Sequence, residues 1–141
     1  MPGRKPDPTV PRGPDGVSGE GSLRVSSHLS LDLRRLGDAS IVRARGDIDL
    51  STLAAASAAL DTAREGSAAL FLGLRDVDFM DTSGLRLVIE EQLRAATSGY
   101  RFAVVPGPRK VQRLFEIAGF AADDELFMEA PTPRIGGGDP A

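Results

Sequence analysis

One short stretch of the chain concentrates the side chains that could do chemistry. Residues 76–85 hold three carboxylates and two hydroxyls, in the order Asp76, Asp78, Asp81, Thr82 and Ser83. The stretch lies between an apolar run and a segment with helical spacing of its apolar residues. In open α/β sheets, the junction between a strand and the next helix is where ligands and partners meet the fold. The sequence therefore places its candidate site here.

These polar side chains have two interpretations. Asp81, Thr82 or Ser83 can cap the helix by accepting hydrogen bonds from its first N–H groups, and Gly84 would then allow close packing. A hydroxyl at the same place can instead carry a phosphate, because free N–H groups and the helix dipole favour an anion. A phosphate adds about −1.5 to −2 charges. It would change what this face binds with little change in shape.

Leu87 suggests that the helix after these hydroxyls has a binding face. With about 100° between successive residues, Leu85, Ile89 and Leu93 fall on the side expected to be buried, whereas Leu87 falls beside Glu91 on the polar side. An exposed leucine one turn from the hydroxyls is either a scattered surface residue or a partner contact.

Composition excludes several classes of site. The chain has no Cys, which rules out disulfides, thiolate metal sites and a cysteine nucleophile. His28 is the single histidine, so a Ser-His-Asp triad or a His-rich zinc site would need a second chain. The net charge of −3 argues against wholesale nucleic-acid binding. The apolar run 68–74 is too short to span a bilayer, and no apolar stretch follows Arg4 and Lys5 as in a secretory signal, so we expect a cytoplasmic protein.

The elements that must position the candidate site follow from apolar periodicity. Alternation over 29–33 predicts a half-buried strand, hairpinned to a second strand over 41–45. Helical spacing predicts helices over 51–65, over 82–98 and around 111–118, the last stopped by Gly119 with Phe120 beyond it. Short apolar runs predict buried strands over 68–74 and 101–105, and a short last strand over 126–128. This order predicts an α/β fold with a mixed, mostly parallel sheet and helices packed on it.

The prolines and glycines mark the edges of the domain. Five of the ten prolines fall in residues 1–14, and none falls between residues 15 and 105. We expect a disordered N-terminal tail over 1–21, one domain over 22–130 and a flexible C-terminal tail over 131–141.

Three segments resemble motifs of the STAS domain of bacterial anti-sigma factor antagonists. Residues 79–85 (FMDTSGL) resemble the family's phosphorylation motif, and residues 46–49 (GDID) resemble its Gly-Glu-[Ile/Leu]-Asp segment. Residues 111–120 (VQRLFEIAGF) resemble its third-helix pattern. The resemblance covers residues 24–130 and keeps the order of the motifs. It implies a STAS-type mixed sheet of four to five strands, with an opening β-hairpin followed by alternating helices and strands.

The resemblance implies a phospho-regulated binding module without catalytic activity. The unphosphorylated antagonist of this family binds an anti-sigma factor that is also a serine/threonine kinase of the histidine-kinase-like ATPase type, and binding releases a sigma factor. The kinase phosphorylates the hydroxyl residue after the motif Asp, and the product dissociates. That position corresponds to Thr82, with Ser83 as its neighbour. A PP2C-type phosphatase reverses the modification.

The resemblance also implies a binding face. Asp49 corresponds to an acidic residue near the phosphorylated position, and we expect partner contacts at Asp49, Asp81, Gly84, Arg86 and Leu87. We expect no cofactor, no metal, no membrane partner and no direct nucleic-acid binding. The sequence leaves open whether the domain forms a homodimer.

The chain departs from the family pattern in several places. Thr82 stands where many members have Ser, so modification could be slower or could fall on Ser83. Asp47 replaces Glu, and the Pro/Gly-rich N-terminal segment is extra. Pro131, Pro133 and the glycines at 136–138 argue against the family's last helix.

Two other hypotheses stay open. A STAS domain that acts as a scaffold or sensor without being phosphorylated would share the fold and the binding face. A Mg²⁺-dependent aspartyl-phosphate protein, such as a receiver domain, would use Asp76 and Asp78, with Lys110 and Asp123-Asp124 as further parts. Receivers need an acidic pair after the first strand, where this chain has Arg34-Arg35.

Overall fold

The computed structural model describes residues 21–26 and 28–130, which form one five-stranded sheet and three helices. The strands are β1 (Gly21–Ser26), β2 (Leu29–Leu36), β3 (Ala39–Ile48), β4 (Ala69–Met80) and β5 (Arg101–Val105). The helices are α1 (Leu53–Arg64), α2 (Thr82–Ser98) and α3 (Arg109–Ile117). The expected tails fall on residues 1–20 and 131–141, outside the described residues, except that Gly21 begins β1.

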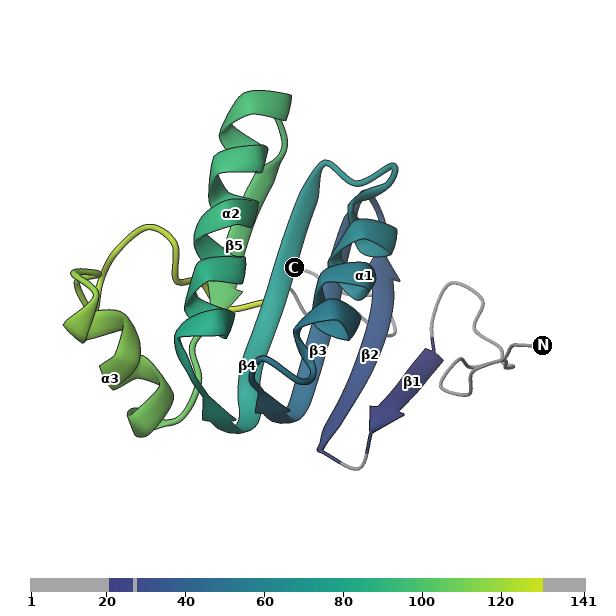
Figure 1. Ribbon diagram of the computed structural model, residues 1–141. Coiled ribbons are helices and arrows are strands. Elements are labelled where there is room, and N and C mark those ends of the chain that lie inside the picture. Colours follow the sequence, from purple (N-terminus) through teal and green to yellow (C-terminus); the bar gives the residue numbers. More distant parts are fainter. Residues whose placement is uncertain (1–20, 27, 131–141) are drawn as a thin grey trace, which may run out of the picture.

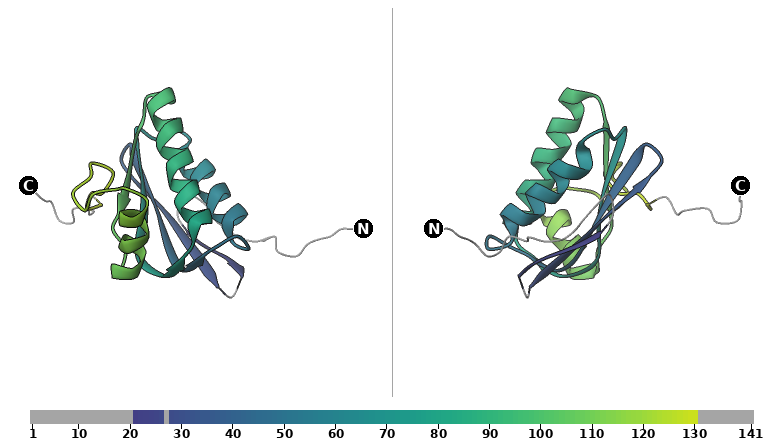
Figure 2. Two further views of the ribbon diagram at one scale, coloured as in Figure 1. Left: turned by 60° about the vertical axis from the view of Figure 1, so that its left-hand side comes forward. Right: turned by 90° about the vertical axis from the view of Figure 1, so that its right-hand side faces the viewer.

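The sheet is mixed, as the sequence predicts, but it is not mostly parallel, because the antiparallel pairs are as many as the parallel ones. Its strands lie in the order β1-β2-β3-β4-β5. The pairs β1–β2 and β2–β3 are antiparallel, whereas β3–β4 and β4–β5 are parallel. Helices α1 and α2 lie side by side on one face of the sheet, and α3 packs against the part of β4 that β5 does not cover (Figures 1 and 2).

The first and last strands differ from the expectation. The sequence did not predict β1, which extends the hairpin β2–β3 by one antiparallel strand. The strand expected over 126–128 is only an isolated bridge between Val104 and Phe127. The N–H of Val104 donates to the carbonyl of Leu126 at 2.7 Å, and the N–H of Met128 donates to the carbonyl of Val104 at 2.9 Å. These two bonds cover part of the outer edge of β5 without continuing into a ladder.

Strand β4 extends beyond the apolar run 68–74 and includes part of the acidic stretch. Asp76 and Asp78 are exposed residues within this strand, beyond the predicted end of the strand at residue 74. Val77 and Met80 keep the strand anchored in the core. The continuous apolar run ends at residue 74, and irregularities in the pairing with β3 shift the side-chain alternation beyond it, so the second half of the strand carries no regular apolar pattern.

The core lies between the sheet and the helices and is closed at the β5 side by aromatic rings. Phe115 on α3 packs edge-to-face against Phe120 and Phe127, with ring centroids 5.7 and 5.2 Å apart. Gly119 ends α3 with a φ of 104°, and the N–H of Phe120 donates to the carbonyl of Phe115 at 2.9 Å. The helix end expected from Gly119 and Phe120 is confirmed.

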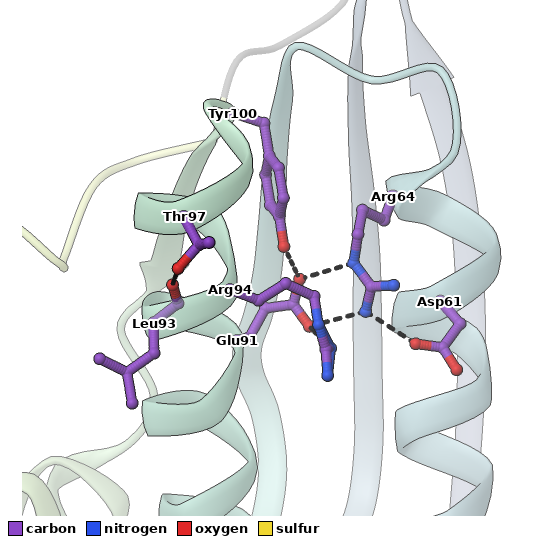
Figure 3. Close-up of polar contacts among 7 residues, drawn as sticks. All are labelled: Asp61, Arg64, Glu91, Leu93, Arg94, Thr97 and Tyr100. Atoms are coloured by element: carbon purple, nitrogen blue, oxygen red, sulfur yellow. Dashed lines mark hydrogen bonds and ion pairs between the residues drawn. The ribbon is translucent and has the colours of Figure 1, made fainter.

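A buried carboxylate joins α1 to α2. Glu91 on α2 is 2% exposed, although the sequence placed it on the polar side of that helix. Arg64 of α1 donates from Nε to Oε2 and from Nη2 to Oε1 of Glu91, each at 2.9 Å, and the hydroxyl of Tyr100 donates to Oε2 (Figure 3). Arg94 lies 3.7 Å from Oε1. These partners satisfy the carboxylate, which lets Glu91 take a core position.

Tyr100 should titrate at unusually high pH. Burial, followed by its hydrogen bond to Glu91, raises the pKa of Tyr100 to about 12, because a phenolate would be desolvated beside a carboxylate. The stabilisation that the neutral Tyr100 side chain provides is fully present below its ordinary pKa of 10.0. It is lost as the pH rises through the raised pKa of about 12. Tyr100 is the single tyrosine and the chain has no tryptophan, so ultraviolet absorbance reports this group alone. In Glu91→Gln the pKa of Tyr100 should be lower than in the unsubstituted protein. A Tyr100 pKa of 10.0 in the unsubstituted protein would contradict the prediction.

Candidate functional site

The parallel pairing of β3 and β4 brings two chain turns to one edge of the sheet. Ile48 is the partner of Met80 in the register, and both residues end their strands. The N–H of Asp81 donates to the carbonyl of Ile48 at 3.2 Å. The loop that starts at Asp49 and the helix that starts after Asp81 are therefore neighbours. The structure thus brings together two segments that carry the sequence-predicted site.

Asp81 is the residue that caps α2. Its backbone is extended, and its Oδ1 accepts a hydrogen bond from the N–H of Ser83 at 2.8 Å. Thr82 is the first residue of the helix and its side chain is exposed, whereas Ser83 is half-buried. Of the three residues that could cap the helix, Asp81 is the one whose side chain does so. This leaves Thr82 exposed at the helix start.

Gly84 is buried in the domain and is not a surface residue. A β-carbon at this position would lie 2.5 Å from Cγ of Met80 and 3.0 Å from Cγ2 of Ile48. The expectation that Gly84 contacts a partner is therefore corrected, because this buried residue instead lets α2 approach the ends of β3 and β4. The alternative that Gly84 allows close packing is the one the structure supports.

Asp49 organises the turn between β3 and α1. Its Oδ1 accepts hydrogen bonds from the N–H and the hydroxyl of Ser51, at 2.9 and 2.7 Å, and from the N–H of Thr52 at 3.2 Å. The hydroxyl of Ser51 is the main cause that lowers the pKa of Asp49 below its ordinary value. Thr52, which the sequence reasoning missed, is 1% exposed and donates from its hydroxyl to the carbonyl of Asp47 at 2.9 Å. Asp49 therefore carries a fixed negative charge in an ordered loop.

Leu87 is buried, contrary to the expectation. It is 7% exposed, whereas Ile89 and Leu93, which the sequence placed on the buried side, are 36% and 64% exposed. The buried face of α2 is turned towards α1, because α1 lies beside α2 over the sheet (Figure 1). A helical wheel gives the spacing of side chains on α2 but does not show where α1 lies.

A shallow groove of about 320 Å³ runs between α1 and α2 beside the helix start. Leu53, Ala54 and Leu87 give it an apolar lining, and the exposed residues Arg86 and Glu90 lie along its α2 side. The remaining lining residues are Leu50, Ser57 and Ser83. Leu50 is 75% exposed at one end, an apolar side chain that the sequence reasoning passed over. The groove thus joins a half-buried hydroxyl to an apolar surface with charges of both signs on its rim.

Within the described residues, the acidic side chains do not gather into a metal site. The part of the chain that the structure describes contains no group of three or more His, Cys, Asp or Glu side chains placed to hold a metal ion. Asp76 lies 3.8 Å from Arg45 on the neighbouring strand, and Asp124 accepts from the N–H of Leu126 at 2.9 Å. Within residues 21–26 and 28–130, no helix is long and apolar enough to cross a membrane.

Comparisons with known proteins identify the family. A family model described as "Mlab, STAS domain" matches residues 23–128. The chain belongs to the STAS domain family. The family named from the three sequence motifs is thereby confirmed. A comparison with curated proteins gave no match.

Solved structures share the fold of this STAS domain. The anti-sigma factor antagonist SpoIIAA in its unphosphorylated form has a TM-score of 0.60 at 19% identity, covering 72% of this chain and 88% of its own. The phosphorylated form of SpoIIAA from Bacillus gives 0.57 at 18% identity, covering 72% and 91%. An anti-sigma factor antagonist from Mycobacterium paratuberculosis gives 0.61 at 21% identity, covering 70% and 85%. The predicted α/β fold is confirmed.

Replacing Asp81 should separate its capping role from its charge. Asp81→Ala removes the acceptor of the Ser83 N–H and should lower the free energy of unfolding by about 1 kcal/mol. Asp81→Asn keeps an acceptor oxygen and should stay within a few tenths of a kcal/mol of the unsubstituted domain. Urea denaturation of the two variants measures both values. Equal losses in both would show that the charge, and not the cap, stabilises the helix start.

Proposed function

We propose that this STAS domain is an anti-sigma factor antagonist, and that phosphorylation of Thr82 switches off its binding to an anti-sigma factor kinase. One observation carries the proposal: Asp81 caps α2, so that Thr82 is exposed at the helix start, next to Ser83, which lines the groove. Two solved structures with this fold are of one antagonist in unphosphorylated and phosphorylated forms. These are the two states that the proposal requires.

Exposure favours Thr82 over Ser83 as the acceptor. A kinase must reach the hydroxyl and place a phosphoryl group in line with it. The Thr82 side chain is exposed, whereas Ser83 is half-buried and its N–H is held by the cap. Ser83 is the second candidate for the modification.

The charges around Thr82 explain how a phosphate could change binding. The dianion would gain from the positive end of α2 and would stand beside the carboxylate of Asp81. Arg86 lies one turn further on, and helical side chains lean towards the N-terminus, which brings residues four apart together. Pairing with the phosphate would draw Arg86 from the groove rim and leave Glu90 there. A partner that docks in the groove would then meet an acidic rim.

The partners follow from this assignment. The unphosphorylated domain binds a kinase of the histidine-kinase-like ATPase type and releases a sigma factor, in the cytoplasm and without catalysis of its own. A PP2C-type phosphatase restores the binding form. Asp49, Arg86 and Leu50 are the exposed or partly exposed side chains that would contact the kinase, while Leu87 forms the groove floor.

Phosphorylation by the cognate kinase tests the site. With ATP, the unsubstituted domain and Ser83→Ala should each gain one phosphate, and Thr82→Ala should gain none, as read by mass spectrometry. Full modification of the double variant Thr82→Ala/Ser83→Ala would show that neither hydroxyl is the acceptor. A phosphate that hydroxylamine removes would identify an aspartyl phosphate and favour the receiver-like alternative.

Binding to the same kinase tests the switch. Thr82→Glu places a carboxylate at the helix start and should weaken binding about tenfold or more. Leu50→Asp should weaken it similarly while leaving stability unchanged, because Leu50 is exposed, whereas Leu87→Asp would bury a charge. The matched charge control is Thr97→Glu, which makes the same substitution at an exposed threonine near the other end of α2 and should leave binding unchanged. A domain that tolerates Thr82→Glu would be an unphosphorylated scaffold or sensor.

A further inference from the structure

The Arg64–Glu91 pair is the polar connection between the two helices that form the groove. In the part of the chain that the structure describes, the hydrogen bonds between side chains of α1 and α2 all join Arg64 to Glu91. Both contacts are 2.9 Å, and they use Nε and Nη2 on one edge of the guanidinium and both carboxylate oxygens (Figure 3). Such a two-point contact fixes an orientation as well as a distance.

Each member of the pair is itself held in place. Asp61 accepts from Nη2 of Arg64 at 2.7 Å, which ties the guanidinium to its own helix. The hydroxyl of Tyr100, just before β5, donates to Oε2 of Glu91. The pair therefore links α1 to α2 and to the sheet beneath, and it limits sliding of α1 along α2 as well as separation from it.

The pair lies at one end of the groove, away from the helix start. The α2 side of the groove ends at Glu90, the residue before Glu91, and its α1 side ends at Ser57, two turns before Arg64. Buried contacts of α1 come from small or flexible apolar residues: Ala56, Leu60 and Ala63. Apolar burial is not directional, so these side chains hold α1 on the sheet but specify its position relative to α2 less sharply than the two-point contact does.

We propose that Arg64 and Glu91 are positioning residues for partner docking: they hold α1 at the spacing from α2 that keeps the groove open. The occupant is an apolar side chain of the kinase, which fits the lining of Leu53, Ala54 and Leu87. This inference rests on the proposed function for its partner. The spacing of the two helices is a property of the free domain and can be measured without the kinase.

The double variant Arg64→Met/Glu91→Leu tests the role of the pair. Removing both charges leaves no buried carboxylate without its partner, so the domain should stay folded, as urea denaturation will show. The chain has no cysteine, so cysteines introduced at the exposed positions Ala58 on α1 and Leu93 on α2 accept spin labels at known sites. Pulsed electron resonance then gives the distance between the helices. The same labels in the unsubstituted background give the reference distance.

The proposal predicts two linked results. The distance distribution should shift or broaden by about 1–2 Å in the double variant, and kinase affinity should fall about tenfold. Glu91→Gln, which keeps an acceptor for Arg64, should retain most of both values. If the double variant does not fold, Arg64→Lys carries the test, because it keeps a positive charge but loses the two-point contact and should change both values in the same direction. An unchanged distribution, or unchanged affinity despite a shifted one, overturns the positioning role. If the unsubstituted domain binds no kinase, the proposed function fails, while the distances still decide whether the pair fixes the helices.

Discussion

The site depends on the parallel pairing of β3 with β4. Because the two strands run in the same direction and end in register at Ile48 and Met80, the turns that follow them emerge at the same edge. The hydrogen bond from Asp81 to the carbonyl of Ile48 carries this pairing one residue beyond the strand. The ordered turn at Asp49 and the start of α2 are therefore held together by backbone geometry, before any side chain of the site makes a contact.

Most residues of the two motif segments build this geometry rather than face a partner. Gly46 has a φ of 109°, and a β-carbon there would lie 2.1 Å from the carbonyl oxygen of His28. Gly84 gives α2 its close approach to Met80 and Ile48. Asp49 and Asp81 each accept hydrogen bonds from the backbone that follows them. Thr82 is the motif residue left exposed at the helix start, which makes it the position whose chemistry can vary without disturbing the fold.

Local periodicity was sufficient to predict most of the elements, because each depends on which of its own side chains are apolar. It failed where a distant segment decides the outcome. Leu87 and Glu91 are buried because α1 lies alongside α2 and presents Arg64, information that a wheel of one helix does not contain. Strand β1 was missed because pairing with β2, more than its own pattern, makes it a strand. The acidic half of β4 was missed because the apolar run ends at residue 74 and irregular pairing shifts the alternation beyond it.

The buried carboxylate also constrains how the sequence can change over time. Glu90 and Glu91 are neighbours of the same type, yet the first is exposed and the second is 2% exposed against Arg64. Position 90 can accept most polar residues in a single step. At position 91, a lone change to an apolar residue leaves Arg64 without an acceptor, and a lone apolar change at position 64 leaves an uncompensated acid. Among relatives of this domain, residues 64 and 91 should therefore vary as a pair, either both charged or both apolar.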